Sequence, residues 1–204
     1  MANSAQLSLM ALAGLSVAIV GYGVSKLAKA GLFQRVLFDV KPVPSDKVWL
    51  VKSYKGKYND IHTKFQALFK VLGDNKSWDE TVGIYYDDPQ EAGANNCRYA
   101  IGLCIPASAD KLQELLINNG YATVTIEKDL PALHCTFPFE GMLSVWLSLF
   151  KVYTACDKEM KKRGWQVTKD AAVVEITRLG VTEFYFMLDV SKQLMNIRAQ
   201  AISS

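Results

Sequence analysis

An apolar run at residues 7–24 constrains this sequence more than any other feature, because it contains no charged side chain. Read as an α-helix, the run spans roughly 27 Å, close to the thickness of the hydrocarbon core of a bilayer. Its serine and glycine residues are tolerated in membrane helices and can support close helix contacts. We therefore expect a single transmembrane helix, acting as a signal-anchor, within residues 1–30.

Two other interpretations of this run are weaker. A buried core helix would show a polar stripe, and none is visible. A cleavable signal peptide would begin with basic residues, whereas Lys26 and Lys29 follow the run. The tripeptide Ala28-Lys29-Ala30 does imitate a cleavage site, so the signal peptide stays open as an alternative. Because the positive charge lies on the C-terminal side, we expect that side in the cytosol and the N-terminus outside.

The rest of the chain has the composition of a globular domain. Hydrophobic residues make up 50% of the sequence and charged residues 21%, which favours a packed core over disorder. The net charge is +3, with no basic run beyond Lys161–Arg163, so we expect no nucleic-acid partner. The four cysteines show no Cys-x-x-Cys spacing and only two histidines accompany them, so we expect reduced core thiols, no metal site and no cofactor.

The segments after the anchor divide into three parts. Residues 31–47 are expected to form a short linker, in which Pro42 and Pro44 favour an extended path. Residues 48–190 are expected to form one domain, and residues 191–204 a C-terminal helix or tail.

Within the domain, the hydrophobic period alternates between that of strands and that of helices. A strand, a helix and two strands are predicted at 48–54, 61–72, 81–86 and 97–105. The same order returns at 132–137, 141–163, 171–176 and 182–188, with a helix at 108–119 and a strand at 121–126 in between. We therefore predict an α+β fold: a duplicated βαββ arrangement with an antiparallel sheet, helices on one face and the other face open.

The longest predicted helix, at 141–163, is expected to bury an apolar face. The residues assigned to that face by their helical spacing are Leu143, Trp146, Leu147, Phe150 and Tyr153. We interpret Trp146 as a core residue, and assign no role to His62 or His134.

Strand alternation assigns the remaining side chains to the two faces of the sheet. If Val174, Ile176, Phe184 and Phe186 lie under the helices, a set of mostly polar residues is left on the open face. In the second half this set is Glu175, Thr177, Glu183, Tyr185 and Met187, and in the first half Gly83, Tyr85, Arg98, Ala100 and Gly102. Without Arg98, these residues form a candidate ligand-binding groove between the halves, with small residues on one wall and a carboxylate with an aromatic on the other. A Glu175 that is simply solvated remains the alternative.

Three short motifs, in their order and spacing, carry a resemblance to a known family over roughly residues 48–190. They are GIYYDDP at 83–89, VVEI at 173–176 and TEFYF at 182–186. Together they resemble the gyrase-inhibitor-like (GyrI-like) small-molecule-binding domains. The resemblance implies that Glu175 meets a cationic or aromatic ligand and that Tyr185 stacks on it. Some relatives hydrolyse cyclopropane-bearing compounds, which would make Glu175 a general base and Tyr185 a proton donor.

A second resemblance is to the animal family of testis-expressed ER-phagy receptors. It rests on the apolar N-terminus, GIYYDDP, the Cys97-Arg98 pair, CTFPF at 135–139 and LSVWL at 143–147. It implies a single-pass protein of the endoplasmic reticulum with a cytosolic GyrI-like domain. Those receptors bind Atg8 proteins through a long acidic tail, whereas this sequence stops at Ser204. Internal aromatic–aliphatic pairs such as Trp146-x-x-Leu149 are expected on helix core faces, where no extended peptide can form.

The sequence therefore favours a membrane-anchored binding module over an enzyme. The expected partners are the lipid bilayer through residues 7–24 and a small hydrophobic or cationic ligand or a protein segment in the groove, with autophagy or membrane proteins as further candidates. The alternatives are an ER-phagy receptor or adaptor in selective autophagy, and a hydrolase of cyclopropane-type electrophiles with Glu175 and Tyr185 as its catalytic residues. No Ser/His/Asp or Cys/His arrangement and no Gly-rich phosphate loop indicates another chemistry.

Overall fold

The structure is a computed structural model that describes residues 22–75, 77–166, 168, 171–188 and 192–201. The predicted membrane span at 7–24 lies outside this part of the chain, apart from 22–24, which belong to a helical segment over 22–29. Among the described residues, no helix combines the length and the apolar character that crossing a membrane requires.

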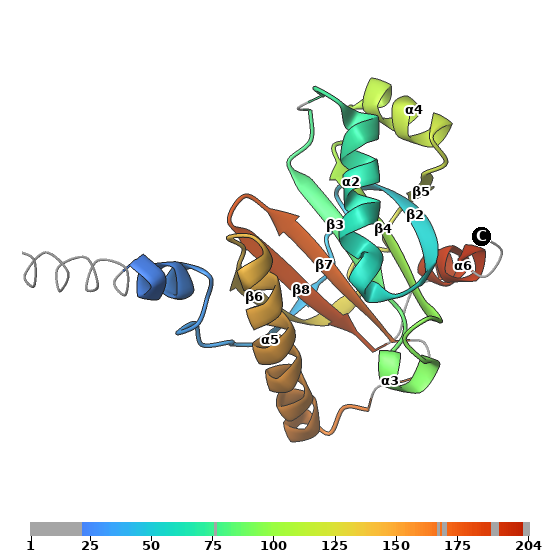
Figure 1. Cartoon of the computed structure of the whole chain (residues 1–204). Helices are drawn as coiled ribbons and strands as arrows, with labels where there is room; N and C mark the ends of the chain where they lie inside the picture. Colours follow the sequence, from blue (N-terminus) through green and yellow to red (C-terminus); the bar gives the residue numbers. More distant parts are fainter. Residues whose placement is uncertain (1–21, 76, 167, 169–170, 189–191, 202–204) are drawn as a thin grey trace, which may run out of the picture.

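An eight-stranded antiparallel sheet forms the centre of the fold (Figure 1). The strand order is β1-β6-β8-β7-β3-β4-β2-β5, which places β7 and β3 side by side in the middle. The strands are β1 (Asp39–Pro42), β2 (Val48–Gly56), β3 (Glu80–Tyr85), β4 (Cys97–Ile105), β5 (Ala122–Val124), β6 (Pro131–Pro138), β7 (Ala172–Arg178) and β8 (Val181–Met187).

Helices lie on both faces of this sheet, so the prediction of one open face is wrong. The described helices are α2 (Ile61–Leu72), α3 (Pro89–Ala92), α4 (Asp110–Asn118), α5 (Met142–Arg163) and α6 (Lys192–Gln200), with a short 3-10 turn η1 (Tyr58–Asp60) before α2. Figure 1 shows α2 and α5 in front of different halves of the sheet. Helices α2 and α4 share one apolar cluster with Leu50, and α5 packs on a separate cluster with Phe184. Leu194 and Ile197 of α6 join the core of the other face, with Val174.

The helices and strands predicted between residues 48 and 190 are present, and two of them have the predicted bounds: α2 and β4. The α+β class and the antiparallel sheet are therefore confirmed. The element orders β2–α2–β3–β4 and β6–α5–β7–β8 follow one another along the chain. The four cysteines are free and buried, as expected of core thiols: Cys97, Cys104, Cys135 and Cys156.

Residues 31–47 are more than the linker that the sequence suggested. Residues 39–42 form β1, which pairs with β6 and places Asp39 opposite His134. Val43, directly after the strand, is only 1% exposed, and its N–H donates to the carbonyl of Leu130. The segment therefore belongs to the sheet. Four residues that end in proline are too few to show the alternating pattern that predicts a strand. The proline is tolerated because β1 is an edge strand.

Helix α5 is turned differently from the prediction. It buries Ser144, Ser148, Val152, Cys156 and Met160, each one turn from the next. Leu143, Trp146 and Phe150, expected in the core, are exposed. Leu147 and Tyr153 pack partly against the core. The small side chains at Ser144 and Ser148 face inwards, so the larger residues of this half face outwards.

Candidate functional site

The pairing of β7 with β8 separates residues that the sequence placed on one face. Glu175 pairs with Phe184, whereas Val174 pairs with Tyr185. Directly paired residues project from the same face. Glu175 therefore lies on the face of α2 and α5, together with Phe184, and Tyr185 lies on the opposite face.

The same register sorts the other candidates of the second half. Thr177 pairs with Thr182 on the helix face, and their hydroxyl oxygens are 2.9 Å apart. Glu183 pairs with Ile176 and therefore joins Tyr185 and Met187 on the opposite face. The prediction that these candidates share one surface is wrong. Both faces of β8 carry large apolar residues, so alternation alone did not fix the register.

Strand β3 extends the helix-face set. Gly83 pairs with Glu175, and Tyr85 lies two residues further along the same side. A Cβ built on Gly83 would lie 2.7 Å from the Tyr85 hydroxyl oxygen, so the Tyr85 side chain folds back over Gly83 towards Glu175. The structure thus brings together four of the predicted ligand-binding residues: Gly83, Tyr85, Glu175 and Thr177.

The small residues predicted to leave room on one wall do not do so. Ala100 pairs with Ile84 on the opposite face and is fully buried. A Cβ on Gly102 would lie only 1.8 Å from the carbonyl oxygen of Leu50. Gly102 is therefore required by the close approach of β2, and it opens no space for a ligand.

Glu175 is a half-buried carboxyl at the centre of the sheet. The hydroxyl of Tyr153, which projects from α5, donates a hydrogen bond to Oε1 of Glu175 at 3.0 Å. Tyr85 is a second hydrogen-bonding neighbour of the carboxyl. The carboxyl is thus held by hydroxyl groups from both sides, one from the sheet and one from the helix that covers it.

Burial raises the pKa of Glu175 from its ordinary 4.5 to about 7, and the hydrogen bonds from Tyr153 and Tyr85 offset only part of that rise. Within the described part of the chain, no Lys, Arg or His forms an ion pair with this carboxyl. Near neutral pH the group is therefore divided between its acid and its carboxylate, and the described residues offer the carboxylate hydroxyl donors but no cation.

Aromatic rings extend from this carboxyl along the first half of the sheet. The Tyr58 ring meets the edge of Tyr85 with the centroids 5.4 Å apart, and contacts Tyr99 at 5.7 Å. Tyr99 stacks on Tyr54 at 5.6 Å. The Tyr58 hydroxyl donates to the carbonyl of Asp87 at 2.7 Å, which fixes η1 against the sheet. These rings form an aromatic environment beside the Glu175 carboxyl.

Sequence reasoning missed two members of this cluster. Tyr153 was assigned only to the apolar face of its helix, although a hydroxyl inside an apolar stripe signals a buried partner. Tyr58 lies in a 3-10 turn that is not predicted from the sequence.

The opposite face carries a different carboxyl, Glu183, within a charged network. Arg178 donates to Oε1 of Glu183 at 2.8 Å, and Lys41 Nζ and His134 Nε2 lie 3.6 and 3.5 Å from Oε2. Tyr185 donates its hydroxyl to the same oxygen. Burial alone would raise the pKa of Glu183, but this hydrogen bond and the nearby cations outweigh burial and lower it. Tyr185 is therefore engaged by Glu183, and the predicted catalytic pairing of Tyr185 with Glu175 across the sheet is wrong.

His134 also has a place in this network. Its Nδ1 lies 2.7 Å from Oδ1 of Asp39, which comes from the neighbouring strand β1. A cavity of about 220 Å³ lies at this edge of the sheet, lined by Leu37, Phe38, Asp39, His134, Cys135 and Thr136. His134 thus links β1 to β8 through two acidic partners, a role that its sequence context did not indicate.

The GIYYDDP motif has a structural function in this fold. Oδ2 of Asp87 accepts hydrogen bonds from the backbone N–H and the Nε of Arg98, both at 2.7 Å. Arg198 of α6 lies 3.4 Å from Oδ1 of Asp87. Burial would raise the pKa of Asp87, but the hydrogen bonds and charges of Arg98 and Arg198 lower it. The motif and the Cys97-Arg98 pair therefore join the β3–β4 region to the C-terminal helix.

Comparisons with known proteins give a distant similarity. No family model matches the chain. Human "Testis-expressed protein 264" is 25% identical over 161 residues, which cover 77% of this chain and 46% of that protein. The mouse "Testis-expressed protein 264 homolog" is 25% identical over 116 residues, covering 55% of this chain and 36% of that protein. The chain thus spans less than half the length of these curated relatives. The similarity supports a distant relationship to Testis-expressed protein 264.

Among solved structures, the crystal structure of the EcmrR C-terminal domain matches with a TM-score of 0.47 and 13% identity. The match covers 74% of this chain and 96% of that domain.

Proposed function

We propose that this chain is a membrane-anchored GyrI-like binding module whose ligand is a lipophilic or aromatic cation held against Glu175. The observation that carries this proposal is the half-buried carboxyl of Glu175, which has a raised pKa and tyrosine neighbours but no cationic partner among the described residues. The similarity to Testis-expressed protein 264 is consistent with it.

The chemistry of the site favours a cation for two reasons. An organic cation would supply the positive partner that Glu175 does not have among the described residues, and binding would draw the carboxyl into its ionised form. Tyr58 and Tyr85 offer ring faces and edges within one cluster, and aromatic faces attract cations most strongly where water is excluded. A cation with an aromatic or alkyl body would use both features. In the protonated form, Glu175 would instead donate a hydrogen bond to a neutral ligand.

The anchor and the location are also part of the proposal. Residues 7–24 support a membrane span by their length and lack of charge, with the N-terminus outside and the domain in the cytosol. Location at the endoplasmic reticulum rests on the resemblance to the testis-expressed receptor family. We interpret the repeated order of a strand, a helix and two strands, centred on the β7–β3 pair, as a duplicated βαββ unit of the GyrI-like type.

Thermal unfolding of the full chain in detergent tests ligand binding. We expect tetraphenylphosphonium or a rhodamine dye to raise the melting temperature of the wild type by several degrees, or about 1–2 kcal/mol of linked binding. Glu175→Gln keeps the shape of the side chain and removes its charge, so it should abolish the shift. Glu127→Gln, on an exposed loop, is the matched control and should preserve it. Equal shifts in wild type and Glu175→Gln would contradict the assigned site.

An ER-phagy receptor or adaptor is the second candidate function, favoured by the similarity to Testis-expressed protein 264. Trp146 and Leu149 are exposed, not buried as predicted, but both lie within α5 and cannot form an extended peptide there. A native transcript that continues past Ser204 into an acidic tail would support the receptor function, provided that the longer chain captures an Atg8-family protein. Capture that is independent of such a tail would require another binding site.

A hydrolase of cyclopropane-type electrophiles is the third candidate. A carboxyl with a pKa of about 7 is suited to act as a general base near neutral pH. Tyr153, and not Tyr185, lies within hydrogen-bonding distance of it. Turnover of an electrophilic cyclopropane by the wild type, lost in Glu175→Gln and lowered in Tyr153→Phe, would support this function. Equal turnover in all three chains would exclude Glu175 as the base, and no turnover by the wild type would exclude the function.

A further inference from the structure

The first half of α5 has an inverted polarity for a helix that packs on a sheet. Its buried positions are Ser144 and Ser148, whereas Trp146 is 66% and Phe150 75% exposed. A surface helix normally buries its apolar side chains and exposes its polar ones. The serines are satisfied inside: Ser144 Oγ accepts from the N–H of Glu140, and Ser148 Oγ donates to the carbonyl of Val145, both at 2.9 Å.

The second half of α5 shows the usual arrangement. It buries Val152, Cys156 and Met160 and exposes Asp157 and Lys158. The inversion is therefore confined to the first half and is not a property of the whole helix. Exposed apolar patches of this kind are typical of interaction surfaces.

A second segment adds an apolar side chain at this end of the domain. The turn between β7 and β8 exposes Leu179 completely. The N–H of Phe139, just before α5, donates to the carbonyl of Gly180 in that turn at 2.9 Å. The turn and the start of α5 are thus joined. We define the apolar patch as Met142, Leu143, Trp146, Leu149, Phe150 and Leu179.

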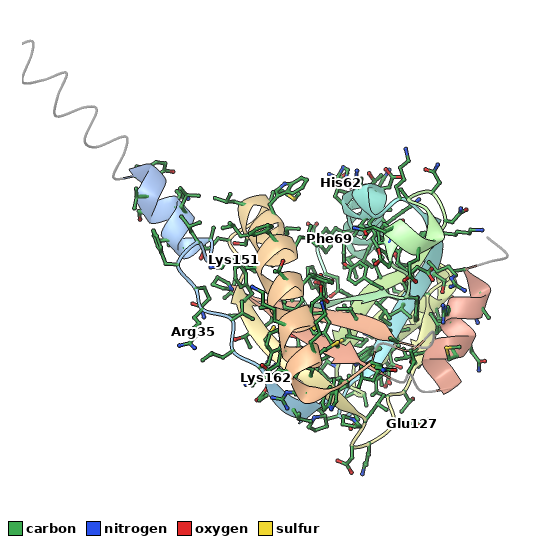
Figure 2. All side chains as sticks on the ribbon, turned by 90° about the horizontal axis from the view of Figure 1, so that it is seen from below. Arg35, His62, Phe69, Glu127, Lys151 and Lys162 are labelled. Carbon is green, nitrogen blue, oxygen red and sulfur yellow. The ribbon has the colours of Figure 1, made fainter. Side chains whose placement is uncertain are left out.

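The N-terminal helix, which the structure describes over residues 22–29, ends beside this patch. Lys151 Nζ donates to the carbonyl oxygens of Gly31, Leu32 and Gln34, at 3.0, 2.6 and 2.6 Å. Figure 2 shows Lys151 where the end of the N-terminal helix meets α5, and Lys162 at the far end of α5. A Cβ on Gly31 would lie 2.5 Å from the Phe137 ring, so this turn packs directly against the sheet.

The composition around this junction matches a membrane interface. Phe33 is exposed in the turn, and the basic residues Lys26, Lys29 and Arg35 are exposed on either side of it. Aromatic side chains collect at the headgroup level of bilayers, and juxtamembrane basic residues are attracted to anionic lipids. A protein partner would not explain why the patch adjoins the segment that follows the uncharged residues 7–24.

We propose that the apolar patch lies in the interfacial layer of the bilayer that residues 7–24 enter, so that the first half of α5 docks the domain on the membrane. The docking surface rests on the proposed anchoring and adds an orientation for the domain. Such a helix would bury its apolar side chains at the boundary between headgroups and acyl chains.

Tryptophan quenching in the full chain tests the docking separately from the anchor. The chain is reconstituted in phosphatidylcholine–phosphatidylserine vesicles whose acyl chains carry bromine near the headgroup. We expect the wild type to float with the vesicles and to be quenched. Trp146→Phe should float equally well but lose most of the quenching. Trp165→Phe, beyond the other end of α5, is the matched control and should retain it. Phe150→Ser keeps the Trp146 fluorophore and should lower its quenching.

Three other results would contradict the docking, and they can be told apart. Flotation with equal quenching in wild type and Trp146→Phe would leave the anchor and reject the docked patch. Failure of the full chain to float would reject the anchor, and the docking with it. Protection of Trp146 from acrylamide that depends on protein concentration and not on lipid would assign the patch to a second copy of the chain. Unchanged melting temperatures in the variants exclude misfolding as the cause.

Discussion

Two glutamates on neighbouring strands, Glu175 on β7 and Glu183 on β8, have opposite acid–base properties. Burial acts on both in the same direction, raising the pKa. Glu175 has hydrogen bonds from tyrosine hydroxyls and no cationic partner among the described residues, and its pKa is raised. Glu183 has Tyr185 together with Arg178, Lys41 and His134, and its pKa is lowered. The residue type is the same, so the difference lies in the surroundings: Glu175 is the more deeply buried of the two, and Glu183 has the cationic partners.

This contrast indicates which carboxyl is available to a ligand. A carboxylate already paired with cations gains little from another, whereas an unpaired one gains the whole interaction. Glu183 therefore stabilises the fold through its ion pairs, whereas the carboxylate of Glu175 has no cationic partner among the described residues. The following predictions test this contrast, from the largest expected effect to the smallest.

The strongest test is the pH dependence of stability. Because folded Glu175 keeps its proton up to a pH of about 7 and the unfolded chain releases it near 4.5, unfolding releases a proton between these values. The free energy of unfolding should therefore fall by about 2–3 kcal/mol as the pH rises through this window. Glu175→Gln should flatten the fall, as measured by urea denaturation at a series of pH values. If the free energy of unfolding of this variant fell with pH as steeply as that of the wild type, a group other than Glu175 would be the cause.

Removing the carboxyl of Glu183 should lower the free energy of unfolding at pH 7, whereas removing that of Glu175 should reduce a loss of stability at that pH. Glu183→Gln removes the acidic partner of Lys41 and one of the two acidic partners of Arg178, which also lies 3.4 Å from Glu80, and we expect a loss of about 1–2 kcal/mol at pH 7. Arg178 is 45% exposed, so the loss stays below that of a fully buried pair. Since the pKa of Glu183 is lowered, the loss should shrink as the pH falls below 4.5, where the wild type also becomes protonated. Glu175→Gln at pH 5 is the control and should cost little.

Two tyrosine-to-phenylalanine changes should separate the faces. Tyr153→Phe removes the donor to Glu175, so the pKa of that carboxyl should rise further, with a loss of about 1 kcal/mol at pH 8. Tyr185→Phe should leave the titration of Glu175 unchanged, because its hydroxyl serves Glu183. Carboxyl ¹³C chemical shifts measured against pH would follow both groups. A change in the Glu175 titration in Tyr185→Phe would contradict the face assignment.

The smallest effect is expected at the rim of the charged network. Lys41 is 46% exposed and lies 3.6 Å from Glu183. Lys41→Ala should cost about 0.5 kcal/mol or less, and the difference should disappear in high salt. Thermal unfolding at low and high ionic strength would measure it. A larger, salt-independent loss would mean that β1 depends on this contact.

The sequence predicted the elements well because their periods are strong. In β4 and α2 the apolar spacing and the flanking turn residues agree, and their bounds follow. The faces of β8 could not be assigned this way, because Phe184 and Phe186 on one side and Tyr185 and Met187 on the other are all apolar enough for a core. The register is set by pairing with β7, which no local pattern records.

The candidate site was predictable only in part, for the same reason. Glu175 was identified from its position on the strand, but its partner Tyr153 comes from a helix whose rotation depends on the small residues Ser144 and Ser148. The sequence suggested the largest side chains, such as Trp146, as the core face. Packing instead placed small side chains inwards, an outcome that depends on the space available between helix and sheet.

The hydrogen bonds of Lys151 to the turn at residues 31–34 also limit how far the domain can move from the N-terminal helix. A flexible linker gives a domain an effective concentration towards every partner within its length. Here the turn is fixed to α5, and β1 begins at Asp39, so no slack separates the N-terminal helix from the sheet. If residues 7–24 lie in a membrane, Glu175 is held at a fixed distance from its surface. Its effective concentration is then high for ligands that arrive along the surface and close to zero for partners that lie at other distances from it. Inserting glycine and serine residues between Gly31 and Asp39 would lower this effective concentration at the surface and let the domain contact partners further from it.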